Sequence, residues 1–123
     1  MLKVENLQVR YGLIPALKGI SFEVPKGSIV TLIGANGAGK TTTLKAISGI
    51  QRSSSGSIEF EGRQIDKFSA PDIVWMVIAH VPEGRRVFRN LTVHENLLMG
   101  GYSAKDKSKV QHNIERIDRK SVV

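Results

Sequence analysis

The sequence of 123 residues contains no cysteine, and only 6% of its residues are aromatic. The absence of cysteine excludes a disulfide scaffold and thiolate metal centres, and it is typical of proteins in a reducing cytosol. The longest apolar runs, such as 73–79, fall far short of the roughly 20 residues that a membrane-spanning helix needs. The first residues include Glu5 and have no continuous apolar core, so they do not resemble a signal peptide. We therefore expect a soluble, cytoplasmic chain.

Acidic residues are also scarce, with 11 Asp and Glu against 18 Lys and Arg, which gives a formal net charge of +7. Basic proteins often bind nucleic acids or anionic membrane surfaces. No aromatic residues are interleaved with the basic ones to stack on bases, so we do not expect nucleic acid as a partner. Hydrophobic residues make up 41% of the chain, an ordinary share for a single folded domain of modest size.

The most informative segment is Gly34–Thr42, which reads Gly-Ala-Asn-Gly-Ala-Gly-Lys-Thr-Thr and contains the pattern G-x-x-x-x-G-K-[ST] in full. In this pattern, backbone N–H groups surround a polyphosphate, a lysine neutralises it and a hydroxyl holds Mg²⁺. Residues 28–33 before it are an apolar, β-branched run that predicts a buried strand, and residues 41–50 after it predict a helix. Strand, glycine loop and helix together predict a nucleoside triphosphate site.

The rest of the chain predicts short strands and helices around this unit. Alternating patterns predict strands over 2–11, 20–24, 58–61 and 77–81. Ser69 with Pro71 predicts the start of a short helix, and Thr92 with Glu95 forms a capping box for a helix that extends to Met99. A charged helical pattern follows from Ser103, with Val110, Ile114 and Ile117 on one stripe. The fold class is therefore α/β, with antiparallel strands around one βα phosphate-binding unit and no domain boundary.

These motifs, in this order, resemble the N-terminal part of an ABC transporter ATP-binding subunit over residues 1 to about 117. The resemblance implies a P-loop NTPase fold of the ABC type, with residues 1–123 forming the N-terminal portion of one ATP-binding domain. The family's Leu-Ser-Gly-Gly-Gln-like signature and its Asp-Glu strand do not occur, so we expect negligible hydrolysis. Residues 118–123 are atypical of the family, which suggests a truncated or frame-shifted product. A sequencing error, a decayed gene and a deliberate fragment remain alternatives.

The resemblance assigns ATP and Mg²⁺ as cofactors and gives roles to individual residues. Lys40 would bridge the β- and γ-phosphates, Thr41 would ligate Mg²⁺ and Thr42 would add a hydroxyl to a phosphate oxygen. Tyr11 would stack on the adenine ring. Taken alone, a tyrosine here is more often a packed strand residue, but the phosphate loop downstream favours stacking. The expected cofactor-binding residues are Tyr11, Gly34, Asn36, Gly37, Ala38, Gly39, Lys40, Thr41 and Thr42.

A second segment, 81–97, corresponds to the loop where the family usually has a metal-contacting glutamine. Glu83 stands there, and Val-Pro-Glu-Gly-Arg at this point is typical of branched-chain amino-acid transporters. A carboxylate can reach Mg²⁺, so Glu83 is a second candidate metal ligand and the one catalytic candidate, unless it only caps a turn. Phe88 and Leu91, beside Arg85, Arg86 and Arg89, lie where relatives grip a membrane subunit. The residues Trp75 and Val77 depart from relatives, which have a charged residue and a glycine nearby.

Three hypotheses about the function stay open. The first is an energy-coupling subunit for branched-chain amino-acid import, bound to permease subunits at the inner face of the membrane and to a second ATP-binding subunit, identical or not. The second is a nucleotide-binding fragment without turnover. The third is an ABC protein that acts on nucleic acid. We expect His80, His94 and His112 to be structural, because none has a second metal ligand at useful spacing.

Overall fold

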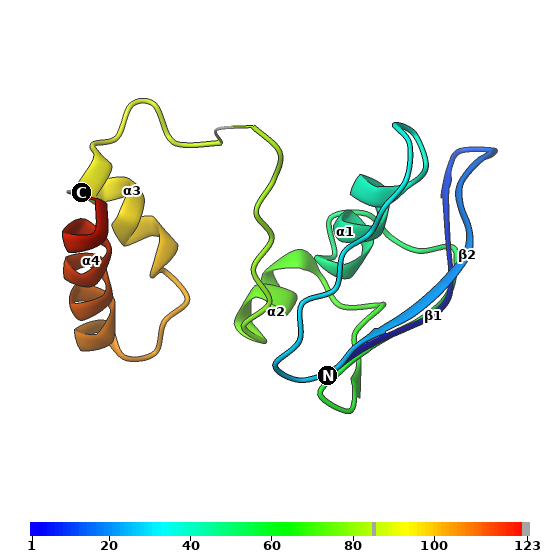
Figure 1. Cartoon of the computed structure of the whole chain (residues 1–123), viewed down its shortest axis with the longest axis horizontal. Coiled ribbons are helices and arrows are strands. Elements are labelled where there is room, and N and C mark those ends of the chain that lie inside the picture. The colour runs from blue at the N-terminus through cyan, green and yellow to red at the C-terminus, as the bar shows by residue number, and fades with distance from the viewer. Residues whose placement is uncertain (85, 122–123) are drawn as a thin grey trace. The chain divides into compact units, whose positions relative to one another are not determined.

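A computed structural model describes residues 1–84 and 86–121, and it divides into two compact units, 1–80 and 81–123 (Figure 1). Arg85, predicted to flank the membrane-facing anchor, and residues 122–123 of the atypical tail lie outside the described residues. The first unit carries the predicted phosphate loop, and the second carries Glu83 and the two C-terminal helices.

The first unit is built on a four-stranded antiparallel sheet with the strand order β2-β1-β3-β4. The strands are β1 (Leu2–Tyr11), β2 (Ile14–Val24), β3 (Ser55–Phe60) and β4 (Arg63–Gln64). The prediction for 2–11 is confirmed. β2 is longer than the predicted 20–24 because it pairs with β1 along its whole length, from Tyr11↔Ile14 to Leu2↔Val24. β3 begins earlier than predicted and ends at Phe60, because the serine-rich loop at 53–57 joins the ladder with β1.

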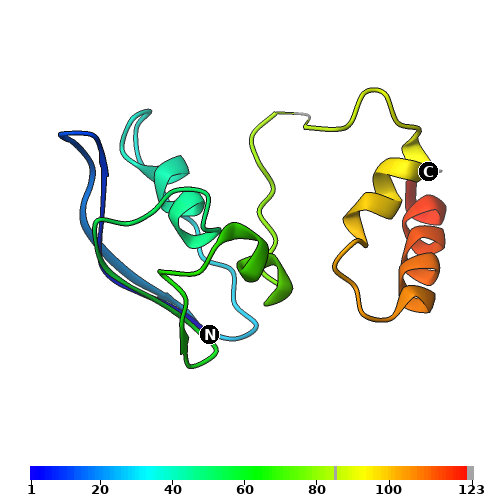
Figure 2. The ribbon, with the colours of Figure 1, turned by 180° about the vertical axis from the view of Figure 1, so that it is seen from behind.

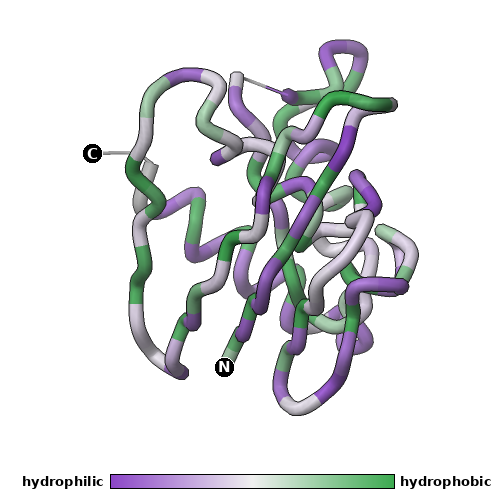
Figure 3. The backbone as a smooth tube through the Cα atoms, turned by 90° about the vertical axis from the view of Figure 1, so that its right-hand side faces the viewer, coloured by the Kyte–Doolittle hydropathy of each residue, from purple (hydrophilic) through white to green (hydrophobic). Residues whose placement is uncertain are grey.

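A bulge in β1 explains how three of its apolar residues reach the core. The register of β1 with β2 shifts between Val4 and Leu7, and Asn6 adopts a positive φ of 45°. Val4, Leu7 and Val9 are consequently all buried, although strict alternation would expose one of them. β3 approaches the bulge so closely that a Cβ on Gly56 would lie 2.3 Å from the carbonyl oxygen of Asn6. Figure 3 shows the alternation of hydropathy along the strand that leads from the N-terminus.

Two helices of the first unit lie on the same side of this sheet (Figure 2). α1 (Lys40–Ile47) confirms the helix predicted after the phosphate loop, and its Ala46 and Ile47 pack into the core of the sheet. α2 (Ala70–Trp75) begins as predicted: the Ser69 hydroxyl accepts a hydrogen bond from the Asp72 N–H at 3.4 Å, and a proline follows in the first turn.

The predictions of strands over 28–33 and 77–81 were wrong, because neither segment forms a strand. Neither segment pairs with another strand in the described ranges, and the side chains of Ile29 and Ile33 are 95% and 93% exposed. The composition of a segment gives it β propensity, but a strand forms only where a neighbour supplies backbone hydrogen bonds. Val77 instead lies in a turn after α2, where its N–H donates to the Val74 carbonyl at 3.0 Å.

The second unit contains α3 (Val93–Gly100) and α4 (Lys107–Ser121). The predicted capping box is confirmed: the Thr92 hydroxyl accepts from the Glu95 N–H at 3.1 Å, and the Glu95 carboxylate accepts from the Thr92 N–H at 2.8 Å. α4 begins later than the predicted Ser103, after Asp106 accepts hydrogen bonds from the Ser108 N–H and hydroxyl. These bonds lower the pKa of Asp106. No helix in the described ranges is both long enough and apolar enough to cross a bilayer.

Candidate phosphate-binding site

The first unit has a cavity of about 410 Å³ where the end of the β1–β2 hairpin meets the glycine loop and the start of α1. Pockets for small molecules usually measure about 300–1,000 Å³, so the cavity has the size of a ligand site. It is lined by Tyr11, Ile14, Pro15, Ala16, Asn36, Gly37, Gly39, Lys40, Thr41 and Thr42.

The glycine loop lies directly against β2. Gly39 precedes α1 with φ 98° and ψ 10°, a backbone conformation that residues with a side chain rarely adopt. A Cβ on Gly39 would lie 2.4 Å from Cδ2 of Leu17 and 3.1 Å from the carbonyl oxygen of Ala16. Both the backbone conformation and the available space therefore require glycine at this position. The close approach holds the N-terminus of α1 at the cavity.

The start of α1 makes this end of the cavity favourable for an anion. The first four N–H groups of an α-helix have no intrahelical acceptor, and the helix dipole places partial positive charge there. Lys40, Thr41 and Thr42 form this first turn and line the cavity. A helix N-terminus of this kind, preceded by a glycine-rich loop, is a common way of binding phosphate.

The ammonium group of Lys40 lies across the loop. Its Nζ donates hydrogen bonds to the carbonyl oxygens of Gly34 and of Ala35, the latter at 2.9 Å. These bonds bring the positive charge back over the glycine loop, beside the N–H groups that begin α1. A polyphosphate in the loop would meet this charge and the helix N-terminus together.

Two hydroxyl groups meet at the other side of the cavity. The Tyr11 hydroxyl and Thr42 Oγ1 are 3.1 Å apart and share a hydrogen bond. Thr42 is only 9% exposed, whereas Tyr11 is 45% exposed, so the ring of Tyr11 is accessible to a ligand. The next residue of the helix, Thr43, is buried and donates its hydroxyl to the Gly39 carbonyl at 2.8 Å.

The donors around the cavity fit a nucleoside triphosphate. Amide N–H groups, an ammonium and hydroxyls suit phosphate oxygens, and a half-exposed tyrosine ring suits a base. None of the lining residues is acidic. Mg²⁺ prefers oxygen ligands and keeps several waters, so here it would be held by the Thr41 hydroxyl together with phosphate oxygens.

The structure gathers most of the predicted cofactor-binding residues around this cavity. Gly34 does not line the cavity itself, but its carbonyl oxygen accepts a hydrogen bond from the Lys40 ammonium, which does. Ala38 lines a neighbouring cavity of about 540 Å³, bounded by residues 15–20 of β2. Sequence reasoning missed Ile14, Pro15 and Ala16. The signal that could have found them is Gly12, which has φ 63° and begins a tight turn that folds these residues back beside Tyr11.

Glu83 belongs to the second unit, whereas Thr41 belongs to the first. Glu83 is exposed, and its backbone carbonyl accepts from Nε of Arg86 at 3.4 Å. No group of three or more His, Asp or Glu residues that could hold a metal ion occurs within 1–84 and 86–121. The roles of Thr41 and Glu83 in metal binding therefore stay predictions.

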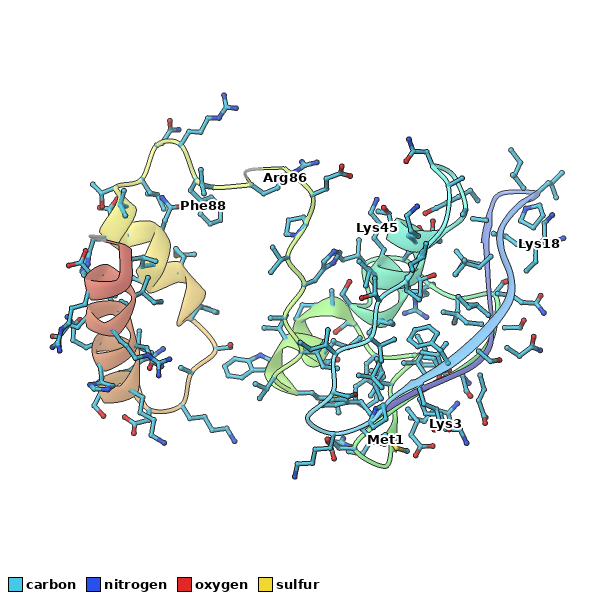
Figure 4. All side chains as sticks on the ribbon, in the orientation of Figure 1. Met1, Lys3, Lys18, Lys45, Arg86 and Phe88 are labelled. Carbon is cyan, nitrogen blue, oxygen red and sulfur yellow. The ribbon has the colours of Figure 1, made fainter. Side chains whose placement is uncertain are left out.

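The segment before α3 presents the residues predicted to grip a membrane subunit. Phe88 and Arg86, labelled in Figure 4, lie on this segment, and Phe88 is exposed. The Phe88 N–H donates to Oδ1 of Asn96 at 2.9 Å, and Nδ2 of Asn96 donates to the Phe88 carbonyl at 3.1 Å. Asn96 of α3 thus holds the backbone of Phe88 in place while its ring remains exposed.

The histidines differ in their surroundings. His80 lies with its Nδ1 3.0 Å from Oγ of Ser48, a buried residue at the end of α1. This contact ties the end of the first unit to α1 and agrees with a structural role. His94 and His112 are exposed on α3 and α4.

Comparisons with known proteins agree with the fold. Residues 17–122 match the ABC transporter family. The chain is 51% identical over 117 residues to the high-affinity branched-chain amino acid transport ATP-binding protein BraG of Pseudomonas aeruginosa, covering 95% of this chain and 50% of BraG. It is 42% identical to the linearmycin resistance ATP-binding protein LnrL of Bacillus subtilis, covering 82% of this chain and 32% of LnrL. The chain thus spans half or less of the length of these relatives.

A solved structure described as an ATP binding subunit of an ABC transporter superposes with a TM-score of 0.76 at 30% identity, covering 88% of this chain and 45% of that one. A dimeric bacterial ABC transporter cassette has a TM-score of 0.79 at 20% identity, which supports the fold alone. The predicted fold class is therefore confirmed, as part of a cassette domain. By its sequence match and its fold, the chain belongs to the ABC transporter family of ATP-binding proteins.

Proposed function

We propose that the chain binds ATP with Mg²⁺ in the cavity between Tyr11 and the start of α1. The observation that carries this proposal is the meeting of three groups at one cavity: the Lys40 ammonium, the N-terminus of α1 and the accessible ring of Tyr11. Each group suits a different part of the nucleotide. The ammonium and the helix terminus suit the phosphates, and the ring suits the adenine.

Each residue then has a definite task. Gly37 and Gly39 allow the backbone to approach the phosphates, with N–H groups from Asn36 through Thr42 as donors. Lys40 exchanges its bonds to the Gly34 and Ala35 carbonyls for charge-assisted bonds to the β- and γ-phosphates. Bound Mg²⁺ would neutralise phosphate charge, with the Thr41 hydroxyl as its ligand. A metal-binding role for Glu83 is proposed from its place in the sequence alone.

The wider role that we propose is that of the ATP-binding subunit of an importer for branched-chain amino acids. It is supported by the 51% identity to BraG, whose name states branched-chain amino acid transport. The partners would be membrane-spanning permease subunits and a second ATP-binding subunit, at the cytoplasmic face of the membrane.

The decisive experiment is titration of the purified chain with ATP in the presence of Mg²⁺, with Lys40→Ala beside it. Charge-assisted hydrogen bonds are worth about 1.5–3 kcal/mol, so the variant should lose affinity by about 10- to 100-fold. Lys45→Ala removes the same charge from the same helix at a position outside the cavity, and it serves as the matched control (Figure 4). Unchanged binding by Lys40→Ala would refute the assignment, and competition by GTP would measure selectivity for the base.

The membrane interface needs a separate test. The chain would be co-expressed with the permease subunits of a branched-chain amino-acid transporter, and the amount that co-purifies in detergent would be measured. Replacement of Phe88 and Leu91 by alanine should reduce it severalfold, because a few buried apolar residues dominate such interfaces. Leu98→Ala alters another exposed leucine of the same unit and should leave it unchanged. If the parent, the Phe88 and Leu91 double variant and Leu98→Ala co-purify with the permease subunits in equal amounts, the result would count against this interface.

A further inference from the structure

The hydroxyl of Thr42 is oriented differently from those of Thr43 and of Ser48 at the end of α1. Threonine and serine inside helices commonly donate back to the carbonyl four residues earlier. Thr43 does so with Gly39 at 2.8 Å, and Ser48 does so with Leu44 at 3.0 Å. The partner that the structure gives Thr42 is instead the Tyr11 hydroxyl, at 3.1 Å. A residue at the end of β1 therefore sets the orientation of a side chain in the first turn of α1.

Thr42 is buried, so its hydroxyl is held by the protein rather than by bulk water. Both hydroxyls line the cavity, and each can donate one hydrogen bond and accept others. A phosphate oxygen only accepts. When Thr42 donates to a phosphate, its hydrogen bond with Tyr11 can persist only if Tyr11 is the donor.

We propose that Tyr11 is a positioning residue for the phosphate end of the site, in addition to any contact that its ring makes with a base. The Tyr11 O–H donates to Thr42 Oγ1, and this leaves the Thr42 O–H directed to a phosphate oxygen. Two hydrogen bonds that share a hydroxyl in this way polarise and strengthen one another. The inference rests on the proposed nucleotide binding, and it adds that affinity for phosphate depends on the hydroxyl of Tyr11.

Inorganic tripolyphosphate with Mg²⁺ separates this role from base stacking, because it has no base. Tyr11→Phe keeps the ring and removes only the hydroxyl. We expect this variant to lose affinity for tripolyphosphate and for ATP by the same factor, about three- to tenfold, the usual worth of one hydrogen bond. Tyr102→Phe, at an exposed tyrosine of the second unit, is the matched control and should bind both as the parent does.

A double-mutant cycle with Thr42→Val tests the coupling directly. Valine has the shape of threonine without its hydroxyl, so in that background Tyr11→Phe should have no further effect on tripolyphosphate affinity. Thr42→Ser keeps a hydroxyl and should bind tripolyphosphate nearly as the parent does. In the Thr42→Ser background, Tyr11→Phe should again lower the affinity for tripolyphosphate. A merely structural role for Tyr11 would instead give independent, additive losses.

The outcomes distinguish the two proposals. If the parent chain binds neither ATP nor tripolyphosphate, the proposed nucleotide binding is refuted, and the positioning role falls with it. If the parent binds both and Tyr11→Phe binds tripolyphosphate equally well, only the positioning role is refuted. Additive losses in the double-mutant cycle would refute it too. Matching far-UV circular dichroism of all variants would exclude misfolding as the cause of any loss.

Discussion

Replacing Val77 by glycine should stabilise the first unit. Val77 has φ 66°, in the left-handed region, and is one of few non-glycine residues there. A β-branched side chain is a poor occupant of this region, because its Cβ crowds the following carbonyl.

The size of the effect follows from three terms. Release from the left-handed region gains about 1–2 kcal/mol for an ordinary side chain. The greater freedom of glycine in the unfolded chain costs about 0.4–1 kcal/mol. The Val77 side chain is 90% exposed, so its removal sacrifices almost no buried apolar surface. Its N–H bond to the Val74 carbonyl is retained by glycine. The net gain in the free energy of unfolding is therefore about 0.5–1 kcal/mol.

Urea unfolding followed by far-UV circular dichroism measures this gain, with parent and variant in the same sucrose-containing buffer. At a slope of about 1–3 kcal/mol per molar urea, the midpoint should rise by a few tenths molar. Ala79→Gly is the matched control, because it introduces glycine two residues later, where φ is not positive. It should lower the midpoint. A midpoint for Val77→Gly at or below that of the parent would refute the reasoning.

Three further predictions concern other local features. Gly39→Ala places a methyl group against Leu17 and should lower ATP affinity at least about tenfold, measured by titration, because the loop must shift away from β2. Thr92→Ala removes the capping box and should cost about 1 kcal/mol of helix stability, read as lower ellipticity at 222 nm. The Met1 ammonium lowers the pKa of the Glu61 carboxyl by its hydrogen bond and its charge. The ion pair therefore stabilises the fold at pH values above the ordinary pKa of glutamate. This stabilisation is lost as the pH falls through the lowered pKa. Glu61→Gln should therefore unfold at lower urea than the parent at neutral pH, and the two should converge in acid; parallel curves would contradict the pairing.

The features that the sequence predicted well depend on neighbouring residues. The capping box at Thr92 and Glu95 and the proline-led start of α2 are determined within a few residues, and both occur as predicted. The glycine loop and α1 were predicted for the same reason, since their pattern is contiguous. Local signals of this kind carry their own hydrogen-bond partners with them.

The failures concern pairing between distant segments. Segments 28–33 and 77–81 have the composition of buried strands but lack strand partners in the described residues, so composition alone misled the prediction. The shift of register at Asn6 and the serine-rich start of β3 likewise depend on neighbouring strands. At the site, Tyr11 was predicted from resemblance, whereas its bond to Thr42 joins two elements that the sequence pattern does not connect.

The exposed segment 28–33 has a practical consequence for work with this chain. Ser-Ile-Val-Thr-Leu-Ile is uncharged, rich in β-branched residues and free of proline and glycine, the composition of segments that stack between copies into β-rich aggregates. The net charge of +7 opposes such stacking, because copies of the chain repel one another. Added salt screens this repulsion over a distance of about 10 Å at 0.1 M. Dilute, low-salt buffers should therefore keep the protein dispersed, and turbidity should rise with ionic strength.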